Sequence, residues 1–232
     1  IITWQDQRVL EQHPSGQGSY FSVLLDRLSE DDIRQVGRES KPSLPLCCLF
    51  WLAEQNKLPS GPLIPAGLAD FVLANLAKTR PTIDYTNAAS HGALNLETMD
   101  WHHSAIAKLG LSHLSWPEFA ALNQPVAELN IDGHRLPAYA PIGDHQCALL
   151  GAFLGNNELS LNISTGSQVS LLTESLILGD YQTRPFFDGR FLNTITRIPA
   201  GRALNTLLNL LTEIATAQNI TIPDPWAYIA QT

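Results

Sequence analysis

The hydrophobic pattern of this chain changes near its middle, and that change limits the folds it can adopt. Apolar residues recur at helical spacing in three segments of the first half, "SYFSVLLDRL" (19–28), "LPLCCLFWLAEQ" (44–55) and "AGLADFVLANLA" (66–77). From residue 135 onward, short β-like runs alternate with helical segments. This mixture predicts an α/β layered architecture, in which ligands gather at the ends of strands.

The second half contains most of the predicted strands. The β-like run in 135–141 leads into Gly143 and Asp144, and a helix is expected over the following "QCALLGAFLG". The later elements are strands in "LSLNIST", "QVSLLTE" and "RFLNTIT" and a long amphipathic helix from about Ala200 to Ala217. We place a domain boundary near 155–157, which gives the domains 1–155 and 156–232. "IITW" at the start of the chain is expected to be a short buried strand.

Composition narrows the functional classes. The chain has 232 residues, of which 44% are hydrophobic and 16% charged, as expected for one or two globular domains with a core. Its formal charge is −8 and its basic residues are scattered, which argues against nucleic-acid binding. No apolar run reaches the length of a membrane span, and no signal peptide is visible, so we expect a cytoplasmic protein without a membrane partner. Because residue 1 is Ile, we also expect this sequence to be a segment of a longer chain.

Three cysteines and several histidines give no metal-binding pattern. Cys47, Cys48 and Cys147 lack metal-ligand spacing, and they are interpreted as small buried hydrophobic residues in a reducing compartment. His91, His102 and His103 form no helical i, i+4 pair.

Asp144 is the first candidate for chemistry. A carboxylate between a strand and a helix can act as a general base, coordinate Mg²⁺, or simply cap the helix. The segment "STGS" (164–167) lies between two β-like runs, where a turn of small residues can direct N–H groups and the Thr165 hydroxyl at a phosphate. A plain hairpin uses the same residue types. Together, an acid and a turn containing Thr165 and Gly166 suggest phosphoryl transfer.

Two other segments carry candidate side chains. In "TWQDQR", Trp4 and Asp6 share one face of an extended chain and could contact a polyol, although a strand end with an ion pair is an equal alternative. In "DYTNAASHGALNLETMDW" (84–101), Thr86 or Asn87 could simply satisfy backbone groups.

The order of these motifs closely resembles that of the FGGY carbohydrate kinases, with glycerol kinase and sedoheptulokinase as the nearest members. "WQDQR", "DYTNAASHGALNLETMDW", "PIGDHQCALLGAF" and "NISTGSQV" occur in the family's order over nearly all of the chain. The resemblance implies an actin-like, ribonuclease H-type fold of two domains, with sugar and ATP bound between them. It implies a sugar-binding domain within 1–155 and the start of an ATP-binding domain in 156–232.

The resemblance also implies roles for individual residues. Asp144 matches the catalytic base and is a candidate ligand for Mg²⁺, while Thr165 and Gly166 match the turn that contacts the phosphates of ATP. Trp4 resembles the tryptophan that lines the polyol site, with Asp6 a weaker candidate. "IPAGRALN" (198–205) is similar to the helix start near the nucleotide, which makes Gly201 a candidate ATP contact.

The resemblance also gives expectations for the substrate and for family motifs that the given sequence lacks. Ser43 occupies the position of a substrate-contacting tyrosine in glycerol kinases, and its smaller side chain favours a ketose such as sedoheptulose over glycerol. A kinase for glycerol, xylulose or ribulose is an alternative. The family's Asp-x-Gly-Thr hairpin would precede Ile1 and its adenine-binding glycines would follow Thr232, so the segment alone is expected to be inactive. A small-molecule sugar is the expected partner, with a homodimer possible. The alternative function is a degenerate relative that binds a sugar or a protein without transferring phosphate.

Overall fold

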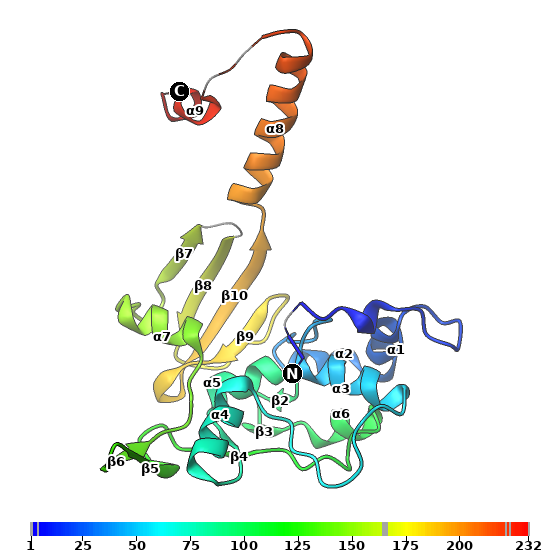
Figure 1. Ribbon diagram of the computed structural model, residues 1–232, viewed down its shortest axis with the longest axis vertical. Coiled ribbons are helices and arrows are strands. Elements are labelled where there is room, and N and C mark those ends of the chain that lie inside the picture. Colours follow the sequence, from blue (N-terminus) through cyan, green and yellow to red (C-terminus); the bar gives the residue numbers. More distant parts are fainter. Residues whose placement is uncertain (1, 4, 164–166, 221, 223, 232) are drawn as a thin grey trace.

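The computed structural model describes residues 2–3, 5–163, 167–220, 222 and 224–231. Short helices packed around one core form the first unit, and an antiparallel sheet followed by a projecting helix forms the second (Figure 1). The first unit has the helices η1 (Arg8–Leu10), α1 (Tyr20–Arg27), α2 (Glu30–Gln35), α3 (Pro45–Glu54), α4 (Leu68–Ala77), α5 (Tyr85–Ala88), η2 (Ala89–His91) and α6 (His103–Lys108). Its strands are β1 (Thr82–Ile83), β2 (Leu94–Asn95), β3 (Asp100–Trp101) and β4 (Glu118–Phe119). The predicted first half, mostly helical with few strands, is therefore confirmed.

Local chemistry fixes where several helices begin. The Ser19 side chain accepts a hydrogen bond from the N–H of Ser22 (3.1 Å) and so caps α1. Helix α2 begins with a reciprocal capping box between Ser29 and Asp32. Pro45 occupies the start of α3, where its missing N–H leaves no hydrogen bond unmade.

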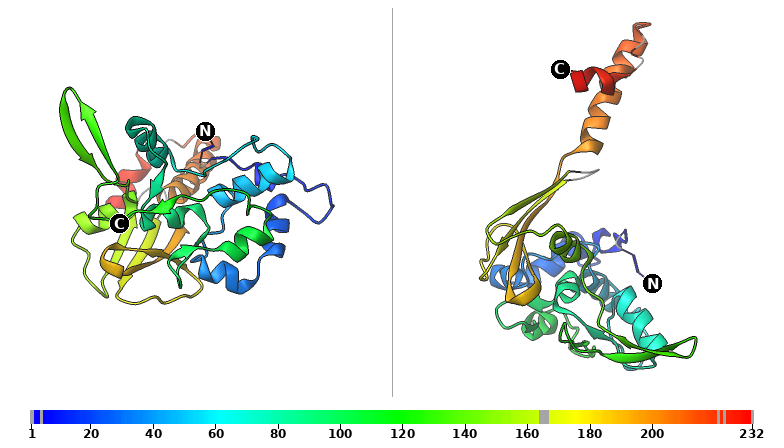
Figure 2. Two further views of the ribbon diagram at one scale, coloured as in Figure 1. Left: turned by 90° about the horizontal axis from the view of Figure 1, so that it is seen from below. Right: turned by 90° about the vertical axis from the view of Figure 1, so that its left-hand side faces the viewer.

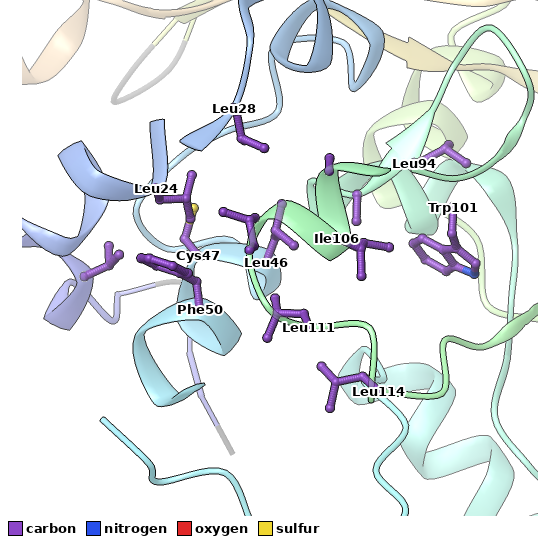
Figure 3. Packing of buried hydrophobic residues seen from close by; sticks show 14 of the residues in the cluster. Leu24, Leu28, Leu46, Cys47, Phe50, Leu94, Trp101, Ile106, Leu111 and Leu114 are labelled. Carbon is purple, nitrogen blue, oxygen red and sulfur yellow. The ribbon is translucent and has the colours of Figure 1, made fainter. Parts of the chain in front are cut away.

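These helices enclose the main core of the protein (Figure 3). Leu24, Phe50 and Leu111 are fully buried, and Trp101 closes one side of the core against Trp116 with ring centroids 4.8 Å apart. Cys47 and Cys48 are buried in α3, while Cys147 in α7 is half-buried, and all three are free thiols. The interpretation of Cys47 and Cys48 as small buried hydrophobic residues is confirmed.

A β-hairpin separates the two units along the chain and projects from the body (Figure 2). Its strands are β5 (Ala127–Ile131) and β6 (His134–Ala138), with Ile131 opposite His134. Asp132 (φ 51°) and Gly133 (φ 81°) make the two-residue turn, which requires left-handed backbone at both positions.

The second unit is a four-stranded antiparallel sheet with α7 against it. Leu149 of α7 packs on Leu172 and Leu192 of the sheet, in a small core of its own. The elements are α7 (Asp144–Gly151), β7 (Leu159–Ile163), β8 (Ser167–Thr173), β9 (Gln182–Pro185), η3 (Phe187–Gly189), β10 (Phe191–Ile198), α8 (Gly201–Ala217) and α9 (Pro225–Gln231), and the strand order is β7-β8-β10-β9. Helix α8 extends beyond the end of the sheet. Helix α9 lies beside the end of α8 that is distant from the sheet (Figures 1 and 2).

Strand β9 joins the two units. The N–H of Thr183 donates to the Gly37 carbonyl (3.0 Å), and a Cβ at Gly37 would lie 2.0 Å from the Thr183 oxygen, so this contact requires glycine. Beside it, the buried Glu39 carboxylate accepts from Arg184 Nε (2.5 Å) and Gln182 Nε2 (2.8 Å).

One predicted element is wrong. Ile2 and Thr3, the described part of the expected N-terminal strand, lie outside any strand and are exposed. A strand needs a partner for its backbone groups, and no pairing involving these two residues occurs among the described strands. Within the described ranges, no helix is both long and apolar enough to cross a membrane.

Candidate active site

Asp144 is the first residue of α7, directly after the irregular segment 139–143. The N-cap position belongs to Gly143, but Asp144 still accepts a hydrogen bond from one of the free N–H groups of the first turn, as the capping alternative predicts. The Asp144 side chain is exposed, and its Oδ1 accepts a hydrogen bond from the N–H of His145 (2.7 Å). Negative charge in the first turn is favoured by the helix dipole. A carboxylate is thus available to solvent at the start of the helix.

The backbone before Asp144 is held by α5. The N–H of Gly143 donates to the Thr86 hydroxyl (2.8 Å), and Asn87 Nδ2 donates to the Pro141 carbonyl (2.8 Å). Asp84, the N-cap residue of α5, accepts hydrogen bonds from both the N–H and the hydroxyl of Thr86. The motif "DYTN" therefore fixes the approach to α7.

The other side of α7 is held by the sheet. His145 Nε2 lies 3.2 Å from the Ser170 hydroxyl, and Gln168 Nε2 lies 3.1 Å from His145 Nδ1. Because an amide nitrogen only donates, Nδ1 accepts and the ring proton lies on Nε2. Burial lowers the pKa of His145, and the positive charge of Arg184 acts in the same direction against the opposing charge of Asp144. The neutral imidazole therefore links the helix to β8.

Gln146 completes this attachment. Its side chain is 2% exposed, and its Nε2 donates to the Pro185 carbonyl at the end of β9 (3.2 Å). A Cβ at Gly143 would lie 2.4 Å from Gln146 Oε1, so glycine permits the close approach of the helix start to this amide. Asp144 consequently lies at the junction of α5, α7 and the sheet.

Ser43 lies at a separate concave surface. It lines a cavity of about 640 Å³ together with Thr3, Ser90 and apolar side chains that include Cys48 and Phe71. A mostly apolar cavity with a few hydroxyl groups is typical of sites for small ligands.

Known proteins with similar sequences are kinases of small polyols and sugars. No protein-family model matches the chain. It is 26% identical over 164 residues to glycerol kinase of Pasteurella multocida, a match that covers 65% of this chain and 30% of that protein. It is 24% identical over 230 residues to sedoheptulokinase of Mus musculus, which covers 92% of this chain and 45% of that protein.

Solved structures agree with the sequence matches. The glycerol kinase of Plasmodium falciparum, solved with ADP, superposes with a TM-score of 0.73 at 18% identity, covering 96% of this chain and 45% of that one. A ligand-bound xylulose kinase from Lactobacillus acidophilus superposes with a TM-score of 0.63 at 18% identity, covering 84% and 40%. The chain is similar in sequence to glycerol kinase and sedoheptulokinase. It has the actin-like ATPase fold of these kinases, and it spans less than half the length of either curated relative described above.

The other predicted site residues of this chain lie in different places. Asp6 accepts hydrogen bonds from Arg8 through both carboxylate oxygens (2.5–3.0 Å), and this pairing lowers its pKa. Gly201 is the first residue of α8. Trp4, Thr165 and Gly166 lie outside the described residues, although the flanking Ile163 and Ser167 are paired across β7 and β8.

Several groups around Asp144 were not predicted as site residues. His145 and Gln146 stand next to it in sequence, but their partners Ser170 and Pro185 could be found only after the sheet was in place. Thr86 and Asn87 were expected to form hydrogen bonds with backbone groups. In the structure, their side chains bind the Gly143 N–H and the Pro141 carbonyl, in the segment before Asp144. Over the described part of the chain, no cluster of three or more His, Cys, Asp or Glu side chains could hold a metal by itself.

Proposed function

We propose that the natural protein transfers the γ-phosphoryl group of ATP to a hydroxyl group of a sugar or polyol, with Asp144 as the general base. The exposed Asp144 carboxylate, at a helix start fixed on both sides, is the observation that supports this role most directly. The sequence matches to glycerol kinase and sedoheptulokinase support the reaction class.

In the proposed reaction, Asp144 accepts the proton of the substrate hydroxyl as its oxygen bonds to the γ-phosphorus. The bond from phosphorus to the β,γ-bridging oxygen breaks, and ADP leaves. Phosphoryl transfer has a loose transition state, so positioning and charge stabilisation provide most of the rate enhancement. Thr165, Gly166 and Gly201 are proposed as the contacts of this chain to ATP.

Mg²⁺ is proposed as the cofactor that neutralises the charge of the ATP phosphates. In phosphotransferases this ion binds one or two carboxylates and completes its coordination with water and phosphate oxygens. An exposed single carboxylate at residue 144 fits that requirement, and a cluster of three acidic side chains is not needed.

We propose a ketose such as sedoheptulose as the substrate, bound by residues of 1–155, with 156–232 contributing to the nucleotide site. The small Ser43 side chain supports a longer substrate than glycerol, and the cavity of about 640 Å³ that it lines is formed by residues of the first unit. The match to sedoheptulokinase over 92% of the chain points the same way. Trp4 and Asp6 are proposed as further sugar contacts, and Asp6 would have to exchange its bonds to Arg8 for bonds to a hydroxyl.

An ADP-release assay on the natural gene product would test this function. Glycerol, xylulose, ribulose and sedoheptulose are compared, each with Mg²⁺ and with excess chelator. Turnover with a ketose and Mg²⁺ is expected. Sugar binding without ADP release on any of the four would instead favour the non-catalytic alternative.

Replacement of the base is the direct test of the site. Asp144→Asn should lower kcat by at least about 10², the usual scale of general-base catalysis, and leave sugar affinity nearly unchanged. Arg202→Gln, at an exposed position of α8, is the control for a change of one charge. Near wild-type turnover of Asp144→Asn would remove Asp144 from the mechanism.

A further inference from the structure

The residue that precedes Asp144 is fixed through its backbone. Gly143 has no side chain with which to cap α7, and its own N–H donates to the Thr86 hydroxyl (2.8 Å), 57 residues earlier in the chain. Two positions before it, the Pro141 carbonyl accepts from Asn87 Nδ2 (2.8 Å). Both bonds come from α5, so this helix sets the path by which the chain enters α7.

The Thr86 hydroxyl can be oriented in only one way. Because the Gly143 N–H donates to it, the hydroxyl oxygen accepts there and its single proton is directed to Asp84 Oδ1. Asp84 and Thr86 are 5% and 6% exposed, and Gly143 is also buried. A hydrogen bond to a carboxylate is stronger than one between neutral groups, and in a buried site it polarises the next bond in the chain.

The hydrogen bonds from Asp84 through Thr86 end at Gly143, which is next to Asp144, the proposed general base. A displacement of about 1 Å in a reacting group can cost about 10²-fold in rate, even when the fold is intact. On the opposite side, Gln146 and His145 attach α7 to the sheet. Of the two bonds from α5, the Thr86 bond is therefore the one closest to Asp144 that ties the helix start to the first unit.

We propose that Thr86, oriented by Asp84, is a positioning residue that places Asp144 for proton abstraction by holding the Gly143 N–H. This inference rests on the proposed function of Asp144. It assigns a role in the reaction to Asp84 and Thr86 of "DYTN", a segment that touches no reacting atom in the proposal.

The test compares Thr86→Val, Thr86→Ser and Asp84→Asn in the natural gene product, with kcat and the KM for sugar measured separately. Thr86→Val keeps the shape but removes both hydroxyl bonds, and we expect kcat to fall by about 10- to 100-fold with KM changed less than about twofold. Thr86→Ser should restore kcat to within about threefold of wild type. Asp84→Asn keeps an acceptor for the hydroxyl but removes the charge, and a loss of about 3- to 10-fold is expected.

A matched control separates positioning from general damage. Thr173 is as buried as Thr86, and its hydroxyl oxygen lies within hydrogen-bond distance of two carbonyl oxygens, those of Ser175 (3.1 Å) and Phe191 (3.3 Å). Thr173→Val should lower the melting temperature by a similar amount but leave kcat within about twofold. Thr86→Val combined with Asp144→Asn should be no slower than Asp144→Asn alone, because a positioning residue has no effect once the base is absent.

The outcomes distinguish this inference from the proposed function. If Asp144→Asn loses activity while Thr86→Val and Asp84→Asn retain wild-type kcat, the positioning role is wrong and the function stands. If Thr86→Val does not fold, the kcat of Asp84→Asn tests the positioning role. A wild-type kcat in Asp84→Asn overturns the inference. If Asp144→Asn itself retains wild-type kcat, the proposed function is wrong and the positioning role is wrong with it.

Discussion

The two units of this protein differ in how far the apolar side chains of their helices are buried. In the first unit, α1, α3 and α6 direct their apolar faces into one shared core, where Leu24 and Phe50 are fully buried. In the second unit, α8 has an equally clear apolar stripe, yet Leu207, Leu210, Leu211 and Ile214 are all more than half exposed, and Leu208 is buried. An amphipathic sequence therefore specifies a helix without specifying what its apolar face contacts.

The units also differ in how they are joined to each other. The contact includes polar groups, with Glu39 of the first unit bound to Gln182 and Arg184 of β9, and Leu176 and Leu178 pack against the core of the first unit. Polar contacts between units depend on exact geometry, whereas core packing depends mainly on volume. Each kind of contact can be tested by a matched pair of substitutions.

The largest expected effect contrasts leucines in the two units. Leu24→Ala in α1 should lower the free energy of unfolding by about 3–5 kcal/mol, because it leaves a cavity in a closed core. Leu210→Ala in α8, where the side chain is 54% exposed, should change it by less than about 0.5 kcal/mol. Urea denaturation of both variants measures the difference. Equal losses would mean that the apolar face of α8 is covered in solution.

An intermediate effect is expected at the junction of the units. Glu39→Ala should cost about 2–3 kcal/mol, since it leaves Arg184 and Gln182 without their buried partner. The control is Glu30→Ala, which removes an ion pair with Arg38 from a side chain that is 70% exposed and should cost at most about 1 kcal/mol. Thermal unfolding monitored by circular dichroism compares the two. Similar losses would contradict a dominant role for Glu39 at the junction.

The smallest expected effect is a pH dependence inside the first unit. Asp70 in α4 is 2% exposed, and its burial, aided by the charge of Asp84, raises its pKa to about 6. The folded state therefore holds this proton more tightly than the unfolded state, so stability decreases as pH rises from about 4 to 6 and remains lower above that.

Asp70→Asn should remove this loss and stabilise the protein by about 1–3 kcal/mol at pH 8, with little gain at pH 4. Melting temperatures at the two pH values test the prediction. Asp26→Asn, at an exposed position of α1, is the control for the loss of one carboxylate from the first unit. A destabilised Asp70→Asn at pH 8 would show that the ionised form is bound favourably in the core.

Much of the secondary structure could be predicted because its causes are local. The helices expected at 19–28, 44–55 and 66–77 form within a few residues of those bounds, as do the strands around 159–163 and 167–173. Strand β9 and the short helices α2 and α5 were not predicted. Four to six residues carry too little periodicity to distinguish a strand or helix from a loop.

The candidate site was predictable in part for the same reason. Asp144 at a helix start followed from the Gly-Asp pair, and its place in α7 is as expected. The bonds that hold it, from Thr86 to Gly143 and from Gln146 to Pro185, join residues 57 and 39 positions apart. No spacing rule relates side chains at such distances along the chain.

The sequence by itself determined the α/β class, the longer helices and strands and the carboxylate at the start of α7. These depend on backbone propensity, capping and hydrophobic periodicity, which act over a few neighbouring residues. The tertiary structure alone decided that α5 would hold the approach to Asp144 and that β9 would bind Glu39. Such contacts arise only when distant segments are brought together, because a hydrogen bond is specified by the position of both partners.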